Sequence, residues 1–211
     1  MKTFDSLSIP ETLEEWVDPA RTALLVYDMQ IGITRQVKGA DAIVDRIALL
    51  VAAARKAGMR IAFCRPHSLP KRWTGVAAMR MALAWQRKDD PADMACWFPP
   101  GEASTDIVPA LAPQEDDMVF DKISMSAFEG TWLATALRDA GISGLAITGI
   151  AMEIGIEPTC RHAADLGFVP ILIADACGAG DAEAAARSVE ALKFAGDTIV
   201  ITQAEFLAAL G

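Results

Sequence analysis

Short apolar runs alternate along this chain with longer segments in which apolar residues recur at helical spacing. The runs predict six strands, at residues 22–27, 59–64, 118–121, 145–148, 168–174 and 198–201. The longer segments predict helices at 40–57, 128–140, 154–166, 181–195 and 203–210. This alternation is typical of βαβ units. We therefore expect an α/β fold, a three-layer α/β/α sandwich with a six-stranded, mainly parallel, doubly wound sheet.

One stretch interrupts this rhythm. Seven prolines fall between residues 66 and 113, between the second and third predicted strands, and a helix is expected there over 73–87. We expect one domain over residues 1–211, with an N-terminal arm at 1–20 and an insertion at 66–113. A long irregular insertion in a compact domain is usually a lid, a binding loop or an interface.

Composition narrows the class of partner. The formal net charge is −9, whereas a nucleic-acid-binding protein needs a basic surface to neutralise phosphates. No apolar run reaches the roughly 18 residues of a membrane span, and the first residues lack the apolar segment of a signal peptide. We expect a cytoplasmic protein with a small-molecule substrate and neither nucleic acid nor membrane as partner. The 53% hydrophobic content allows a large core and a subunit interface.

Cysteine and histidine are sparse. The four cysteines form no C-x-x-C pair, and the two histidines, His67 and His162, lie 95 positions apart. Metal sites and Ser-His-Asp triads need such residues in clusters. We therefore expect no metal and no other cofactor, and reduced, buried thiols.

The candidate chemistry lies where predicted strands end. Asp28 closes the first strand, Lys122 closes the third, and residues 150–155 form the turn after the fourth. Ligands of open parallel sheets gather outside the carboxyl ends of the strands. Taken singly, Asp28 would be a helix cap and Lys122 a surface charge. Their common position at one edge of the sheet is what indicates a functional site.

These motifs resemble the isochorismatase-like hydrolase family, which includes the cysteine amidohydrolases of the nicotinamidase type. The resemblance covers residues 22–180 and rests on four segments: Ala23-Leu-Leu-Val-Tyr-Asp28-Met-Gln30, Lys122-Ile-Ser-Met-Ser-Ala-Phe128 with Thr131, Thr148-Gly-Ile150-Ala151 with Thr159 and Arg161, and Asp175-Ala176. It implies Asp28, Lys122 and Gly155 as catalytic positions. It also implies substrate contacts from Phe128, Ile150, Ala151 and Glu153.

The chain departs from this pattern at the nucleophile. Cysteine-type relatives place it seven positions after the threonine that matches Thr148, which is Gly155 here. The covalent route, with a thiolate nucleophile and a backbone oxyanion hole, is therefore missing. Cys160 points elsewhere, because five residues along a helix do not return to the same face. Cys64, at the end of the second strand, is the remaining candidate nucleophile. The alternative is that it is a buried thiol without a role in the reaction.

True isochorismatases also resemble this sequence and carry glycine at that position. Their reaction protonates a vinyl ether, adds water to the oxocarbenium ion and releases pyruvate. The resemblance thus implies Asp28 as general acid, with Lys122 binding a substrate carboxylate or tuning Asp28. The acid role of Asp28 conflicts with the presence of Lys122 beside it, because a nearby ammonium lowers the pKa of an aspartate. Desolvation has the opposite effect and raises that pKa.

Recognition of the substrate has changed. True isochorismatases have tyrosine and histidine where Ala151 and Glu153 stand, and the segment after the second strand reads Arg65-Pro-His67. A nicotinamidase metal site would need an aspartate at position 65. Arg65, His67 and Trp73 are candidates for binding a substrate carboxylate beneath an aromatic ring. The alternative is that the charged residues of this cluster are only solvated charges in a loop. Glu153 is a second acid or base, or only a favourable charge at a helix start.

Three hypotheses follow. The leading one is a non-covalent hydrolase of a small anionic substrate, with Asp28 as acid or base, Lys122 as its electrostatic partner and the turn at Gly155 leaving room for substrate or water. The second is a catalytically silent ligand-binding or assembly homologue. The third is an amidohydrolase that uses activated water or Cys64. Family precedent and the apolar composition favour a homodimer or homotetramer.

Overall fold

The computed structural model describes residues 1–211 and contains one six-stranded sheet, in which every neighbouring pair is parallel. Its order is β5-β4-β3-β6-β7-β8. The strands are β3 (Thr22–Tyr27), β4 (Arg60–Pro66), β5 (Met118–Lys122), β6 (Gly144–Ile150), β7 (Val169–Gly178) and β8 (Ile199–Ile201). The predicted α/β class and the six strands are confirmed.

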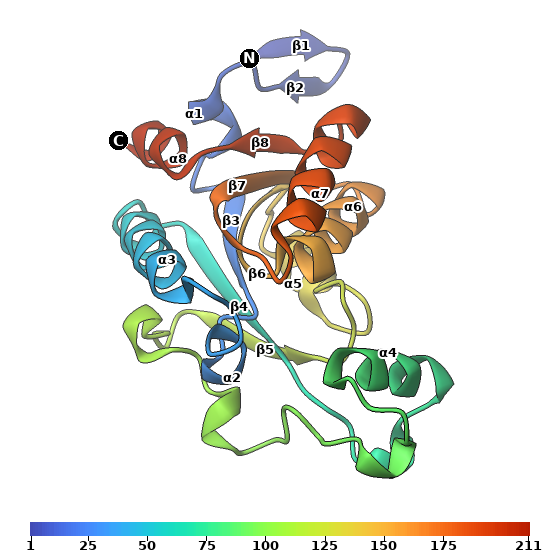
Figure 1. Ribbon diagram of the computed structural model, residues 1–211. Coiled ribbons are helices and arrows are strands. Elements are labelled where there is room, and N and C mark those ends of the chain that lie inside the picture. The colour runs from blue at the N-terminus through green and yellow to red at the C-terminus, as the bar shows by residue number, and fades with distance from the viewer.

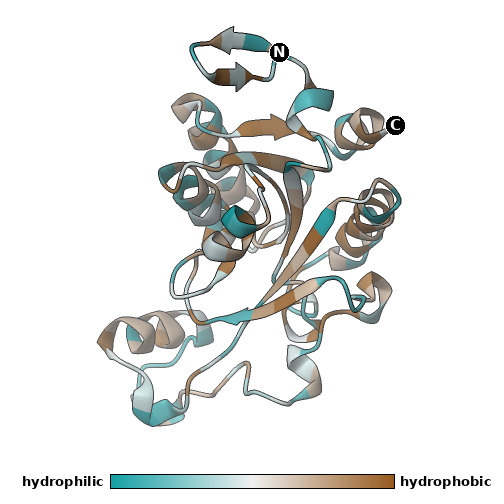
Figure 2. Cartoon of the chain, turned by 180° about the vertical axis from the view of Figure 1, so that it is seen from behind, coloured by the Kyte–Doolittle hydropathy of each residue, from teal (hydrophilic) through white to brown (hydrophobic).

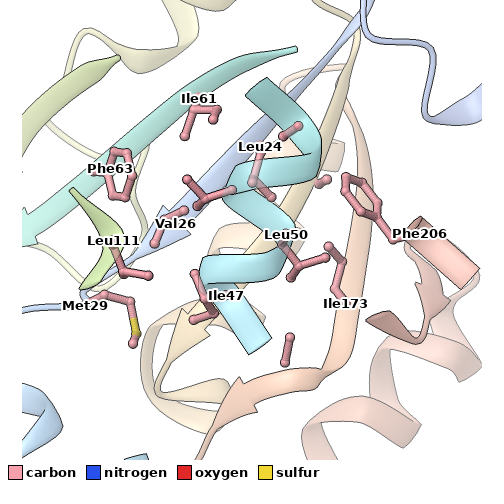
Figure 3. Packing of buried hydrophobic residues seen from close by; sticks show 14 of the residues in the cluster. Leu24, Val26, Met29, Ile47, Leu50, Ile61, Phe63, Leu111, Ile173 and Phe206 are labelled. Atoms are coloured by element: carbon pink, nitrogen blue, oxygen red, sulfur yellow. The ribbon is translucent and has the colours of Figure 1, made fainter. Parts of the chain in front are cut away.

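Helices cover both faces of this sheet (Figure 1). The core on one face is formed with α3 (Ala40–Lys56) and α8 (Gln203–Leu210), and that on the other with α5 (Leu133–Asp139), α6 (Glu157–Asp165) and α7 (Ala182–Ala195). Figure 3 shows the first core, where Ile47 and Leu50 of α3 and Phe206 of α8 pack over the strands. No helix combines the length and the apolar character needed to cross a membrane.

Strand β3 shows why the sheet lies between two layers. All six of its residues are buried, and the central strands are strongly apolar along their length (Figure 2). Alternate side chains of a strand point to opposite faces. Leu24 and Val26 accordingly enter the core beneath α3, while Leu25 and Tyr27 enter the core beneath α5 and α6.

The N-terminal arm is more ordered than a simple extension. Strands β1 (Lys2–Phe4) and β2 (Leu7–Ile9) form an antiparallel hairpin, and a short helix α1 (Leu13–Trp16) follows. The hairpin stands apart from the six-stranded sheet at the top of Figure 1. Its six strand residues are exposed.

The predicted insertion divides into two parts. Its first part carries η1 (Lys71–Trp73), α4 (Val76–Gln86) and η2 (Pro91–Asp93), and none of these elements has a buried residue. Its second part, with η3 (Ala103–Thr105) and η4 (Pro109–Leu111), returns to the core, where Leu111 is 1% exposed. The Gln30 amide donates to the carbonyl of Thr105 at 3.0 Å and ties this part to the short helix α2 (Ile31–Thr34).

Two predicted helices begin at other residues than expected. The helix predicted at 128–140 begins at Leu133, because the hydroxyls of Ser124 and Thr131 bond backbone carbonyls of the preceding turn and compete with helical bonding. The helix predicted at 154–166 opens with a π-helical turn, η5 (Met152–Ile156), before α6. The final helix, 203–210, has the predicted bounds.

Candidate active site

The site lies at the switch point of the sheet. From β3 the chain passes to β4 and β5 on one side, and then to β6 on the other side of β3. Such a reversal leaves a crevice at the carboxyl ends of the two adjacent strands. Asp28 directly follows β3, and Ile150 ends β6, so both lie at this crevice.

Asp28 and Lys122 form a buried ion pair there. The Lys122 ammonium lies 2.9 Å from Oδ2 of Asp28, and the two residues are 4% and 6% exposed. The same ammonium donates to the carbonyl of Ser124 at 3.1 Å and lies 4.4 Å from the centre of the Tyr27 ring. The structure thus brings together the predicted acid and amine. Neither residue has the helix-cap or surface role that each would have alone.

The backbone and the environment of Asp28 are both unusual. Its φ is +52°, in the left-handed region that non-glycine residues seldom adopt and that is often found at functional sites. Burial raises the pKa of its carboxyl to about 6, while Lys122 and the Cys64 thiol act in the opposite direction. Of the two opposed influences expected from the sequence, desolvation is the stronger. Asp28 can therefore hold a proton at mildly acidic pH.

Gly155 is in contact with Tyr27, not with open space. An ideal Cβ on Gly155 would overlap the hydroxyl and Cζ of the Tyr27 phenol and would lie 2.7 Å from its Cε1. The hydroxyl donates a hydrogen bond to the carbonyl of Met125 and holds the ring there. The expectation that the turn at Gly155 leaves room for substrate or water was wrong. Tyr27, directly before Asp28, fills that room.

The thiol of Cys64 contacts the carboxylate of the ion pair. Its Sγ lies 3.3 Å from Oδ1 of Asp28, yet the residue is 1% exposed and does not line the cleft. Burial, together with the neighbouring Asp28 charge, raises the pKa of this thiol well above its ordinary value. Nucleophilic cysteines need a depressed pKa and access to substrate. Cys64 has neither, and its thiol instead donates a hydrogen bond to the carboxylate of Asp28.

A cleft of about 670 Å³ opens above the pair. Asp28, Lys122, Ile150 and Ala151 line its floor, and His67 and Trp73 line it from the segment that follows β4. His67 Nε2 lies 3.2 Å from Oδ1 of Asp121 without hydrogen-bonding geometry. Six of the ten residues singled out from the sequence therefore share one cavity.

The other four do not line it. Phe128 stacks on Phe168, with ring centres 5.7 Å apart, and belongs to the core. Glu153 accepts the backbone N–H groups of Gly180 and Asp181 at 2.7 and 2.8 Å, so it fixes the turn before α7. The side chain of Phe128 therefore belongs to the core. Oε1 of Glu153 is taken by the backbone, while its Oε2 is buried without a hydrogen-bond partner.

Arg65 is engaged as well. Its Nε donates to Oδ1 of Asp121 at 2.7 Å, which neutralises the cation expected to bind a substrate carboxylate. Gly155 lies behind Tyr27 and reaches the cleft through no atom of its own. No group of three His, Cys, Asp or Glu side chains stands in a geometry able to hold a metal ion.

Sequence reasoning missed Tyr27 and most of the aromatic wall of the cleft. Tyr27 is the single tyrosine of the chain and directly precedes Asp28, which was a usable signal. Its meaning depends on the packing of β3 against the turn at Gly155, a contact between residues 128 positions apart. The wall, formed by Trp85, Trp97 and Phe98, comes from a segment without strand or helix periodicity beyond α4.

The doubly wound α/β sheet places a buried acid–amine pair at its switch point, where the pair faces a cleft of substrate size, and this is the architecture of an enzyme active site. A family model for the isochorismatase domain matches residues 22–205. The chain belongs to the isochorismatase family.

Several named proteins are similar to this chain. The chain is 32% identical over 170 residues to the uncharacterized isochorismatase family protein YecD of Escherichia coli O157:H7, covering 77% of this chain and 82% of that one. It is 30% identical over 176 residues to the ureidoacrylate amidohydrolase RutB of Pantoea ananatis, covering 75% and 69%. The crystal structure of a cysteine hydrolase from Pseudomonas syringae pv. phaseolicola superposes with a TM-score of 0.78 at 25% identity, covering 92% and 94%.

Proposed function

We propose that this protein hydrolyses a small substrate without a covalent enzyme intermediate, with Asp28 as the proton donor and Lys122 as its electrostatic partner. The observation that carries this proposal is the buried pair at the floor of the cleft, with Nζ 2.9 Å from Oδ2. Tyr27 occupies the space that a side chain at position 155 would need, which supports a route without a nucleophile at that position.

The chemistry needs only a proton and water. Protonated Asp28 transfers its proton to the terminal carbon of a vinyl ether, and water adds to the oxocarbenium ion that forms. One proton of that water returns Asp28 to its acid form. The second proton passes to the leaving oxygen as the hemiketal collapses to a carbonyl group and the C–O bond breaks. Positioned acids of this kind contribute about 10²–10⁴-fold to rate, and their pKa should lie near the working pH. The pKa of about 6 for Asp28 meets that condition.

The expected anionic character of the substrate has little support in the cleft. Lys122 is paired with Asp28, and Arg65, paired with Asp121, does not line the cavity. The ammonium of Lys122 stabilises the ionised form of Asp28 after proton transfer. Before the transfer Asp28 is neutral, so Lys122 can balance a single negative charge on the substrate but does not require one. We accordingly propose the proton-transfer mechanism without a required negative charge on the substrate.

Two alternatives remain separable by experiment. The amidohydrolase alternative is favoured by the similarity to RutB and by the contact of Cys64 with Asp28. The catalytically silent alternative would keep the ion pair as a structural feature. The first requires a reactive thiol or an activated water, and the second predicts no turnover at all.

The first experiment assays the purified protein against isochorismate, small carboxamides and ureides. Cys96 is exposed and lines the cleft, so alkylation there would block substrate sterically. The assay therefore uses Cys96→Ser protein, untreated and treated with iodoacetamide, beside Cys96→Ser/Cys64→Ala. We expect turnover that survives both changes. Loss of turnover in both treated and Cys64→Ala protein would establish a cysteine mechanism, and no turnover by folded protein would support the silent alternative.

The pH dependence of kcat/KM should reveal the role of Asp28. Because burial raises the pKa of the carboxyl from 3.8 to about 6, the acid form persists to higher pH than for an ordinary aspartate. A general acid acts only in that form, so we expect kcat/KM to fall about tenfold per pH unit above pH 6. A profile that instead rises through pH 6 would assign Asp28 as a general base and contradict the proton-donor role.

A further inference from the structure

The cleft above the Asp28 and Lys122 pair is mainly apolar. Twenty of its 31 lining residues are hydrophobic. The charged residues among them are Asp28, Lys122 and Arg87. The first two form the ion pair, which carries one net positive charge when Asp28 is in its acid form. A substrate with several charged groups would leave them unpaired against this wall, at a high desolvation penalty.

Three aromatic side chains, those of Trp85, Trp97 and Phe98, form an aromatic wall of the same cleft. Trp85 from α4 and Trp97 from the segment after η2 are stacked, with ring centres 6.2 Å apart and planes 13° from parallel. Phe98 packs edge-on against Trp97, with ring centres 6.3 Å apart. Stacked and edge-on rings offer flat faces to which another flat apolar group binds well.

This wall is not covered by the rest of the chain. Trp85 is 44% exposed, Trp97 and Phe98 are half-buried, and α4 has no buried residue. In Figure 1, α4 stands on the β5 side of the molecule, away from α3 and α8. Exposed aromatic side chains that are grouped around a cavity usually mark a binding surface. Here the exposed wall is continuous with the floor that holds Asp28.

We propose that the substrate of this site carries a flat, uncharged apolar body, such as an aromatic ring system, that lies against Trp85 and Trp97 while its scissile bond reaches Asp28. The proposal rests on the proposed hydrolase function and specifies its substrate class. A cavity of about 670 Å³ is within the size range of sites for drug-sized molecules. The insertion is thus the specificity element of the enzyme.

The test measures binding apart from turnover. Isothermal titration calorimetry compares 2-naphthamide, which has a flat neutral body, with succinamate, which is small and anionic. We expect 2-naphthamide to bind at least 10-fold more tightly than succinamate. Equal affinity, or tighter binding of succinamate, would overturn the proposal.

Variants locate the binding. Trp85→Ala and Trp97→Ala should each weaken 2-naphthamide binding at least 10-fold, because each removes half of the stacked pair. Phe194→Ala is the matched control, since Phe194 is a 93% exposed aromatic residue on α7 that does not line the cleft. Far-UV circular dichroism checks the fold of every variant. Unchanged affinity in folded Trp85→Ala and Trp97→Ala protein would overturn the proposal.

Two further outcomes distinguish failure of the proposed substrate class from failure of the proposed hydrolase function. Tryptophan-dependent binding of 2-naphthamide, with no turnover of any substrate, would support the apolar site and contradict the hydrolase function. Asp28-dependent turnover of small anions that Trp85→Ala leaves unchanged would support the function and overturn the apolar substrate class. If sedimentation shows that Trp85→Ala dissociates an oligomer while ligand affinity is unchanged, the wall is an interface between copies of the chain and the proposal falls.

Discussion

Gly155→Cys is expected to lower the free energy of unfolding by about 3 kcal/mol, the upper end of the usual cost of overpacking, because the new side chain must displace the Tyr27 phenol. The overlap begins at Cβ, which is fixed to the backbone and has no rotamer that avoids the ring. Tyr27 has little freedom to move, since it is 2% exposed and its hydroxyl is bonded to the carbonyl of Met125. Denaturant unfolding followed by circular dichroism measures the loss.

Tyr27→Val should rescue this variant. Tyr27→Val alone leaves a cavity and is expected to lower stability by roughly 2–4 kcal/mol, but in the double variant the cysteine occupies part of that cavity. We therefore expect a favourable coupling of about 2–3 kcal/mol in the double-mutant cycle. Gly75→Ala is the control, because an added Cβ there meets no atom within 4 Å. Additive effects of the two substitutions would show that Tyr27 and Gly155 do not compete for one space.

The same double variant tests what the tyrosine does to the chemistry. With the phenol removed, a thiol at 155 would lie near Asp28 and Lys122, so it should react with iodoacetamide in Cys96→Ser background. Peptide mass spectrometry locates the modified residue. Modification at 155 would support the idea that Tyr27 and Gly155 together commit the site to a non-covalent route, whereas an inert thiol there would contradict it.

Asp28→Asn is expected to lower kcat by about 10²–10⁴-fold on whichever substrate the wild type turns over, because the amide cannot transfer the proton. The substitution keeps the shape of the side chain. It also leaves the Lys122 ammonium buried without its counter-charge, which destabilises the fold by about 3–5 kcal/mol. Steady-state kinetics on protein of verified fold measures the effect on rate.

A second variant separates loss of chemistry from loss of fold. Asp28→Asn/Lys122→Met removes both charges, so we expect its stability to recover relative to Asp28→Asn while its activity stays low. Recovery of activity together with stability would show that Asp28 acts only through the fold. The matched conservative change is Cys64→Ala, which removes a thiol that touches the same carboxylate and should leave most of the activity.

The sequence by itself determined the architecture and predicted that Asp28 and Lys122 lie together, which the structure confirms. Short continuous apolar runs and helical segments with period 3.6 predict buried strands and amphipathic helices from local spacing alone. The ends of the predicted strands place Asp28 and Lys122 at one edge of a parallel sheet. The boundaries that failed lie in turns such as 123–132, where the Ser124 and Thr131 hydroxyls bond the backbone in place of helical partners.

The tertiary structure decided what surrounds that pair. Whether Asp28 is protonated depends on desolvation by residues distant in sequence, and whether a glycine opens a space depends on the strand packed against it, where Tyr27 stands. The sequence marked Arg65, Phe128 and Glu153 as substrate contacts, but long-range partners engage all three. Local spacing sets secondary structure, whereas the charge, burial and free volume of a site arise from contacts between segments that only the folded chain brings together.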